Sequence, residues 1–370
     1  MKVAIVGGGV AGLAIGWRLV QAGVATGIFE KGISGRAATW AAAGMLAATA
    51  ETGAGDDPHA RLAREARRAW PEFALRLEGV SKVAIDFRED GALMLASDSA
   101  RARELSDLGE TLRTRGENTR WLSRDEARQM EPRLTPEFNG ALFLSDDAHV
   151  DNRALGPALT EAFQRAGGRL HENCEARALT IEQDRVRAIV TAEGTFEADS
   201  VVIAAGAWTN LVGGVAPGML PQIKPSKGQV TSLAPPDGAA LPRHVIWGNE
   251  VYLVPRRDSL LIGATVEDAG FDASVSRAAR DTLVAGAVRM IPDLAHWRVA
   301  ESWAGFRPRS ADEMPVLGGT QIAGLFVASG QFRNGILFAP IIADIMRDCV
   351  MGRAASPFAR AFDPGRFLQS

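Results

Sequence analysis

The sequence predicts an α/β protein with two domains, one built on a sheet assembled from separated segments and one an inserted α+β domain with an antiparallel sheet. Three observations support this prediction. They are a glycine-rich strand–loop–helix unit at the N-terminus, two later apolar strands that each end in glycine, and a β-rich segment between those strands. At 370 residues, the chain is long enough for two domains.

The first thirty residues have the pattern of a dinucleotide-binding unit. A strand, a glycine loop, a helix, a second strand and an acidic residue follow in order: Lys2–Val6; Gly7, Gly9 and Gly12; Leu13–Ala22; Ala25–Phe29; and Glu30. The glycines allow a tight turn and a close approach to a pyrophosphate, which the helix N-terminus attracts. Glu30 is placed to accept hydrogen bonds from a ribose diol. The sequence therefore predicts a Rossmann-like nucleotide site.

The middle of the chain alternates between predicted helices and strands. Charged amphipathic helices are expected over residues 58–78 and 100–130, with a hairpin of residues 83–87 and 92–96 between them and Gly91 at its turn. Asp151 is expected to cap a helix that ends before Gly167. After a hairpin around residues 192–194, the apolar run Ser200–Ala205 predicts a parallel strand that returns to the first sheet.

A β-rich segment follows, and the chain then returns to the first sheet again. Strands are expected over residues 228–233, 251–254 and 260–265, then over 325–328, with a helix from about Gly335. The predicted nucleotide-binding domain comprises residues 1–80, 141–220 and 310–370. The predicted substrate domain comprises residues 81–140 and 221–309.

Composition excludes several classes of function. The net charge is −3, and arginines alternate with acidic residues along the predicted helices, so a nucleic-acid partner is not expected. Two cysteines and scattered histidines predict neither a disulfide framework nor a metal site. The chain starts with a predicted strand and has no apolar run that could span a bilayer, so we expect a cytoplasmic protein without a signal peptide.

The cofactor follows from the single glycine fingerprint. A nicotinamide enzyme normally completes its cofactor fold in one block, whereas this chain returns at residues 200–206 and 325–335, each time with a strand ending in glycine. A long, permanently held flavin explains such dispersed contacts better. The Ala- and Gly-rich run Ser34–Leu46 would let backbone amides approach a flat ligand, although composition alone also allows a tightly packed helix.

The chain resembles the FAD-dependent D-amino acid oxidase superfamily, and within it the glycine oxidases of bacterial thiamine biosynthesis. Four stretches carry the resemblance: the N-terminal fingerprint through Glu30, Thr39–Leu46, Trp303–Pro308 and Gly330–Leu337. The resemblance implies a flavoprotein with an FAD-binding Rossmann-like domain. Because no cysteine lies in Ser310–Pro315, where some relatives attach the flavin, we expect FAD to be held non-covalently.

The resemblance also implies roles for individual residues. Tyr252, Arg307 and Arg333 would be catalytic, with Arg307 and Tyr252 on the substrate carboxylate, and Glu250 and Val266 would line the substrate pocket. The residues implied to contact FAD are Gly7, Gly9, Val10, Ala11, Gly12, Glu30, Lys31, Thr39, Trp40, Ala42, Ala43, Gly44, Met45, Leu46, Ala176, Ala205, Gly206, Trp208, Arg307, Gly330, Arg333, Asn334, Gly335, Ile336 and Leu337. The segment from Gly330 would bring a helix N-terminus towards the pyrimidine end of the flavin, where negative charge collects on reduction.

Residue chemistry is compatible with these roles and leaves alternatives open. A buried arginine before Pro308 needs an anionic partner, which could be a substrate carboxylate or a fixed structural carboxylate. From position alone, Tyr252 could be an ordinary sheet aromatic. Glu250 stands where a glycine oxidase would have a histidine or a neutral polar group. Its charge could select substrates, or it could face solvent.

The predicted reaction is oxidation of glycine, sarcosine or a small D-amino acid. The resemblance implies hydride transfer from Cα to flavin N5, giving a 2-oxo acid, ammonia or an amine, and hydrogen peroxide from oxygen. A D-amino acid dehydrogenase that passes electrons to a quinone and a non-oxidase flavin-binding module are the alternatives. The expected partners are the small-molecule substrate and oxygen, and the sequence leaves open whether the protein is a homo-oligomer.

Overall fold

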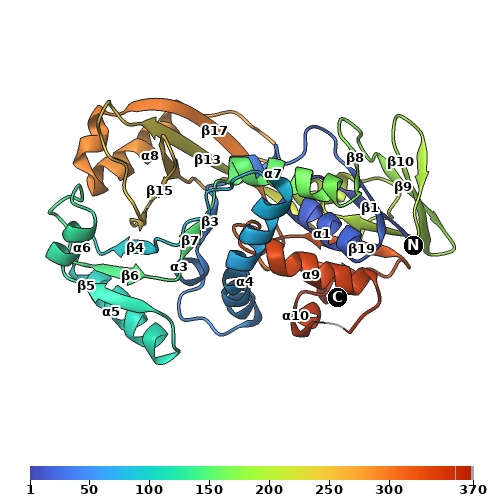
Figure 1. The fold of residues 1–370 in the computed structure, drawn as a ribbon, viewed down its shortest axis with the longest axis horizontal. Coiled ribbons are helices and arrows are strands. Elements are labelled where there is room, and N and C mark those ends of the chain that lie inside the picture. The colour runs from blue at the N-terminus through green and yellow to red at the C-terminus, as the bar shows by residue number, and fades with distance from the viewer. Residues whose placement is uncertain (355, 368–370) are drawn as a thin grey trace.

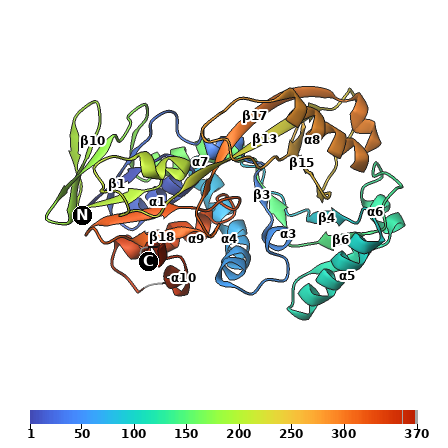
Figure 2. The same cartoon turned by 180° about the vertical axis from the view of Figure 1, so that it is seen from behind.

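The computed structural model describes residues 1–354 and 356–367, which form two lobes (Figure 1; Figure 2). The N-terminus lies in one lobe with the helices α1 (Val10–Gln21) and α9 (Ala339–Val350). The inserted segments make up the other lobe. The long strands β13 (Lys224–Ala234) and β17 (Arg298–Arg309) pair along their length and connect the two lobes.

A six-stranded sheet forms the centre of the first lobe, in the order β18-β19-β12-β1-β2-β8. Its strands come from separated parts of the chain: β1 (Lys2–Val6), β2 (Ala25–Phe29), β8 (Arg169–His171), β12 (Ser200–Ile203), β18 (Val316–Gly319) and β19 (Leu325–Ser329). All neighbours are parallel except β18 and β19. As predicted, the chain leaves this sheet and returns to it, with β12 pairing with β1 and β19 with β12.

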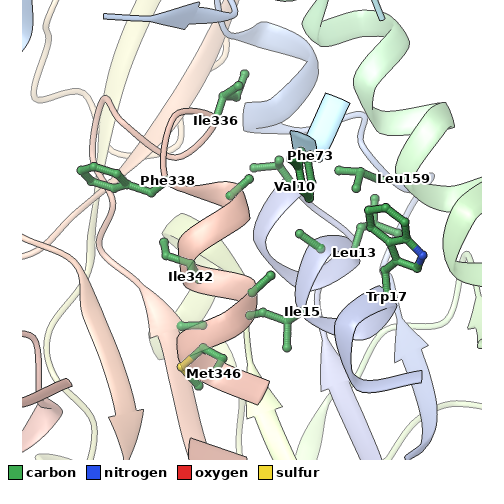
Figure 3. Packing of buried hydrophobic residues seen from close by; sticks show 14 of the residues in the cluster. Val10, Leu13, Ile15, Trp17, Phe73, Leu159, Ile336, Phe338, Ile342 and Met346 are labelled. Carbon is green, nitrogen blue, oxygen red and sulfur yellow. The ribbon is translucent and has the colours of Figure 1, made fainter. Parts of the chain in front are cut away.

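The helices of the first lobe share one apolar core. α1 packs beside α9, and the core is completed by α4 (Pro58–Ser81) and α7 (Asn152–Arg165). Figure 3 shows the side chains that meet there, and the following are at most 1% exposed: Leu13, Trp17, Phe73, Leu159 and Ile342. Asp151 caps α7 as predicted, because its carboxylate accepts from the amide of Arg153 at 2.9 Å. This packing fixes the position of α1 within the first lobe.

An eight-stranded mixed sheet forms the second lobe, in the order β17-β13-β16-β15-β14-β4-β6-β5. Its further strands are β4 (Ala92–Leu95), β5 (Thr119–Leu122), β6 (Ala141–Leu144), β14 (Val245–Trp247), β15 (Tyr252–Pro255) and β16 (Leu260–Gly263). Only β14 and β4 are parallel neighbours. The antiparallel pairing of β15 with β16, and of β16 with the long strand β13, confirms the predicted antiparallel character of the inserted domain.

The remaining elements are shorter or peripheral. The strands are β3 (Met45–Leu46), β7 (Ala148–His149), β9 (Ala178–Glu182), β10 (Arg185–Val190) and β11 (Thr195–Glu197). The helices are α2 (Ala38–Ala41), α3 (Ala48–Thr52), α5 (Ser99–Thr114), α6 (Arg124–Met130), α8 (Arg277–Met290) and α10 (Pro357–Ala361), with 3₁₀ turns at Gly206–Leu211, Pro292–His296 and Pro364–Phe367. The hairpin of β10 and β11 is the one predicted around residues 192–194.

Several predicted elements are wrong. Residues 83–87 form no strand, because Ile85 is buried in the core of the first lobe, and β4 pairs instead with β6 and β14. The predicted helix over 100–130 is two helices separated by β5, because Gly116, at φ +83°, ends the first. The C-terminal helix starts at Ala339 after a turn, later than the expected Gly335. The domain division stays a prediction, although β6 pairs in the second sheet and the predicted segment 141–220 assigns it to the first domain.

Candidate active site

A cavity of about 430 Å³ is lined by residues from both sheets. Five parts of the chain contribute: the start of α1, the segment from Ala38 to Glu51, the residues after β12, the strands β13 to β17 of the second sheet with their loops, and the end of β19 with the stretch after it. The predicted site residues that line it are Gly9, Val10, Ala11, Thr39, Ala42, Ala43, Gly44, Met45, Gly206, Glu250, Tyr252, Val266, Arg307, Arg333, Asn334, Gly335 and Ile336. The structure therefore brings these predicted cofactor and substrate residues together around one cavity.

The glycine loop presents open backbone at one end of this cavity. Gly9 is the N-cap residue of α1 and has no side chain to occupy the helix terminus. The amide of Val10 donates to Oγ1 of Thr39 at 2.9 Å, whereas no described residue accepts from the amides of Ala11 and Gly12. A helix N-terminus with unpaired amides is an anion site, which suits a pyrophosphate.

The other glycines of the loop serve packing. A Cβ on Gly12 would overlap the carbonyl oxygen of Gly7, so the close approach of α1 to β1 requires glycine there. By contrast, a Cβ on Gly9 would meet only Oγ1 of Thr39, at 3.7 Å. The carboxylate of Glu30 accepts from the amide of Gly8 at 2.7 Å, so Glu30 lies beneath the loop.

The carbonyl groups of the Ala- and Gly-rich segment accept hydrogen bonds from side chains that do not line the cavity. Nδ2 of Asn152 donates to the carbonyls of Thr39, at 2.9 Å, and Trp40, at 2.8 Å. Nε1 of Trp303 donates to the carbonyl of Ala41 at 2.9 Å. Only Ala38–Ala41 is helical, so the alternative of one tightly packed helix is wrong beyond Ala41.

The next residues expose their amides to the cavity. The carbonyl of Ala43 accepts from Arg256, and that of Gly44 accepts from the amide of Val150 at 2.9 Å. Ala43 and Gly44 line the cavity, and within the part of the chain that the structure describes their amides donate to no acceptor. Paired carbonyls and unpaired amides give this segment a row of donors that matches a flat ligand rich in acceptors.

Arg307 and Tyr252 form the polar centre of the cavity. Both lie on the second sheet, Arg307 on β17 and Tyr252 on β15, with β13 and β16 between these strands. Gly228 allows the guanidinium to cross β13, because a Cβ at this position would overlap it. Nη1 of Arg307 donates to the carbonyls of Thr265, at 3.1 Å, and Lys227, at 3.4 Å.

The charge of Arg307 is not balanced by a paired carboxylate. Among the described residues, no carboxylate lies within ion-pair distance of it, so the structural carboxylate considered above is absent from that part of the chain. Burial lowers the pKa of Arg307 and raises the pKa of the neighbouring Tyr252, so the tyrosine stays protonated and can donate. A half-buried guanidinium that lacks a paired carboxylate and lies beside a hydroxyl donor is suited to bind a ligand carboxylate.

Glu51 is a residue of the cavity that the sequence did not reveal. It lies on α3, and its carboxylate is 3.9 Å from Nη1 of Arg333. Burial raises the pKa of Glu51, while Arg333 and Arg307 oppose that change. Asp147 holds α3 in place by accepting from the amides of Thr49, at 3.0 Å, and Ala50, at 3.1 Å. An acid after a run of small residues was the only signal in the sequence.

The predicted pocket residues Glu250 and Val266 lie at the rim. The side chain of Glu250 is 62% exposed and forms an ion pair with Arg289 of α8. Val266 is 50% exposed. The structure therefore favours the solvent-facing alternative for Glu250, and the acid that lies inside is Glu51.

The remaining predicted cofactor residues do not line this cavity. Trp40 lies under the guanidinium of Arg153, and Trp208 stacks on Phe271. Lys31 pairs with Glu175 at the surface, 2.9 Å away. The full set outside the lining is Gly7, Gly12, Glu30, Lys31, Trp40, Leu46, Ala176, Ala205, Trp208, Gly330 and Leu337. Contacts of these residues with a cofactor stay a prediction.

The described residues contain neither a candidate metal centre nor a helix that could cross a membrane. They contain no group of His, Cys, Asp and Glu that could hold a metal ion. Cys174 is buried and Cys349 is half-buried, and neither lines the cavity. No helix in the described ranges is both long and apolar enough to cross a membrane.

Known proteins resemble this chain over nearly its full length. Glycine oxidase from Geobacillus kaustophilus is 37% identical over 94% of this chain and 92% of its own. A crystal structure of a glycine oxidase from that organism superposes with a TM-score of 0.93 at 35% identity, covering 99% of both chains. Iminodiacetate oxidase from Chelativorans sp. BNC1 gives a TM-score of 0.88 at 26% identity, covering 98% of both chains.

A longer relative is also similar. The bifunctional protein ThiO/ThiG of Synechocystis is 34% identical over 99% of this chain, and the match covers 54% of that protein, so the chain spans about half its length. The model of the family described as FAD dependent oxidoreductase matches residues 2–349. The resemblance predicted from four motifs is thereby confirmed, together with FAD as the cofactor. The chain belongs to the FAD-dependent oxidoreductase family.

Proposed function

We propose that this chain is an FAD-dependent oxidase of glycine, sarcosine or a small D-amino acid. The observation that carries the proposal is Arg307, a half-buried guanidinium that pairs with no carboxylate of the described residues, in the same cavity as the Ala43 and Gly44 amides, which have no acceptor among those residues. One part of the cavity thus fits a carboxylate and another part fits a flat cofactor. The glycine oxidase relatives support the same reaction.

The residues present fit FAD. The amide of Ala11 at the N-terminus of α1 would hold the pyrophosphate, and those of Ala43 and Gly44 would hold the ring. The turn that enters α9 places Gly335 and Ile336 at the cavity, with amides that no described residue accepts from. When bound, FAD supplies the acceptor for the hydride that leaves the substrate carbon.

The protein residues bind and orient the substrate. Nη1 of Arg307 is held by two carbonyls. Neither Nε nor Nη2 donates to a carbonyl or carboxylate of the described residues, so these groups are left for the hydroxyl of Tyr252 and a substrate carboxylate. The hydroxyl of Tyr252 donates to the same carboxylate. A fixed carboxylate leaves the amine-bearing carbon in one orientation, which is the main catalytic contribution required of the protein.

Glu51 and Arg333 adjust the charge around the amine. Because they lie 3.9 Å apart, each offsets the charge of the other, and the carboxylate of the substrate is directed to Arg307. Glu51 also supplies the negative charge inside the cavity that favours an amine over a second carboxylate. The cavity is therefore suited to small substrates with one carboxylate and one amine.

Oxygen consumption on a substrate panel tests this function. The panel contains glycine, sarcosine, D-alanine and L-alanine, and each is assayed with and without an artificial electron acceptor. We expect oxygen uptake and hydrogen peroxide with at least one of the first three. Turnover that requires the artificial acceptor would identify a dehydrogenase instead, and FAD-loaded protein inert towards the whole panel would contradict the proposal.

A further inference from the structure

A buried arginine lies behind the cavity, away from the substrate groups described above. Arg256 follows β15 and is only 8% exposed. Its Nη2 donates to the carbonyl of Ala43 and, at 2.7 Å, to Oδ1 of Asn152. Burial lowers the pKa of Arg256 to about 10, so it is still a cation at neutral pH. Burying a cation costs desolvation free energy, so a specific role would explain why Arg256 is at this position.

Asn152 links the same cation to the preceding peptides. It is 1% exposed, and its Nδ2 donates to the carbonyls of Thr39 and Trp40. Asn152 is also the first residue of α7, whose packing against α1 and α4 makes it a rigid support. Arg256 and Asn152 thus fix three carbonyls of one segment that lines the cavity.

The geometry of Gly44 leaves this segment little freedom. Gly44 has φ +71°, and a Cβ there would overlap the carbonyl oxygen of Val150 and come within 2.9 Å of Nη2 of Arg256. The peptide between Ala43 and Gly44 therefore has its carbonyl on the cation and its N–H unpaired at the cavity. Because one resonant peptide unit carries both groups, a cation on the carbonyl makes the N–H a stronger donor.

We propose that Arg256 is a positioning residue that fixes and polarises the Ala43–Gly44 peptide, so that this chain binds reduced FAD more tightly than oxidised FAD. The inference rests on the proposed placement of the flavin against residues 39–46. Reduction adds negative charge to a flavin, so a stronger donor and a nearby buried cation both favour the reduced form. Asn152 acts with Arg256, because it holds both the guanidinium and the segment.

The test is the reduction equilibrium of FAD-loaded variants, measured against a redox dye in the absence of substrate. Arg256→Gln should lower the equilibrium constant for two-electron reduction about tenfold, which corresponds to a potential about 30 mV more negative. Arg256→Lys keeps the charge and should recover at least half of that change. Arg257→Gln, at the adjacent exposed position, is the matched control and should leave the potential unchanged.

Two further measurements keep the test decisive. If Arg256→Gln does not fold, Asn152→Leu should lower the equilibrium constant in the same direction. Arg256→Lys should then lower it by no more than about threefold, which is half of the change in potential expected for Arg256→Gln. An unchanged potential in folded Arg256→Gln or in Asn152→Leu, or an equal shift in Arg257→Gln, would overturn the proposal. The reduction equilibrium is measured without any amino acid. A wild-type enzyme that oxidises neither glycine, sarcosine nor a small D-amino acid would therefore refute the proposed function and leave this result unaffected.

Discussion

Removing the guanidinium of Arg307 is the perturbation whose size the structure predicts best. Two carbonyls occupy Nη1, so Nε and Nη2 can donate one or two hydrogen bonds to a substrate carboxylate. Each hydrogen bond to a charged group contributes about 1.5–3 kcal/mol, and we expect Arg307→Ala to lose about 2–4 kcal/mol of transition-state stabilisation. That loss corresponds to a decrease in kcat/KM of about 30- to 700-fold.

The assay compares substrates with and without a carboxylate. The kcat/KM of Arg307→Ala is measured for glycine and for a simple primary amine, and FAD content is measured from the absorption spectrum. The kcat/KM for glycine should fall by the full expected factor, and the kcat/KM for the amine should fall much less. The FAD content should not change. Arg298→Ala, at the exposed start of the same strand, is the control and should behave as wild type. Equal losses for both substrates would refute a carboxylate-binding role.

Three further predictions concern the cofactor loop, the charges of the pocket and a buried histidine. Gly9→Val should abolish FAD binding in a folded protein, since a Cβ has room there, whereas Gly12→Ala should destabilise the fold, since its Cβ overlaps Gly7. Glu51→Gln should raise the kcat/KM for iminodiacetate relative to that for glycine by about fivefold, or ~1 kcal/mol, because it removes a charge of the same sign as the second carboxylate. Substitution of the exposed Glu250 by Gln should not change the ranking of the substrates by kcat/KM. Burial lowers the pKa of His149 from 6.5 to about 3, so its stabilising contribution is present above pH 6.5 and is lost as the pH falls. Between pH 7.5 and 5, the free energy of unfolding should therefore fall by about 2 kcal/mol more in wild type than in His149→Leu.

Each of these predictions has a direct check. FAD content and circular dichroism separate the two glycine variants, and full FAD content in folded Gly9→Val would show that the loop is only structural. A substrate ranking that changes in Glu250→Gln but not in Glu51→Gln would reverse the roles assigned to the two acids. Urea unfolding of wild type and His149→Leu with the same pH dependence would show that another group titrates.

The sequence predicted those features that depend on local pattern. The order of strand, glycines and helix around Gly9 is contained in thirty residues, and apolar strands ended by glycine identify β12 and β19 as members of the first sheet. In each case the residues that determine the element are neighbours in the chain. The carboxylate-binding role of Arg307 came from the family resemblance, and the structure adds the unpaired charge that makes it physically reasonable.

The features that were missed depend on partners far away in the chain. Residues 92–95 form a short apolar run after Gly91, as a hairpin strand could, but their partners are β6 and β14. Glu51 lies inside the cavity because Asp147, almost a hundred residues later, holds α3. Glu250 faces solvent because Arg289 draws it to α8. Neither contact has a local signature in the sequence.

Anaerobic addition of glycine to the purified protein tests the central claim most directly. The protein should be yellow, lose its flavin absorption when glycine, sarcosine or a small D-amino acid is added, and release intact FAD on acid treatment. Loss of colour with the amino acid but not with the matching amine would support both the cofactor and the role of Arg307. A colourless protein that retains a nicotinamide nucleotide, or a flavin that none of these amino acids reduces, would contradict the account.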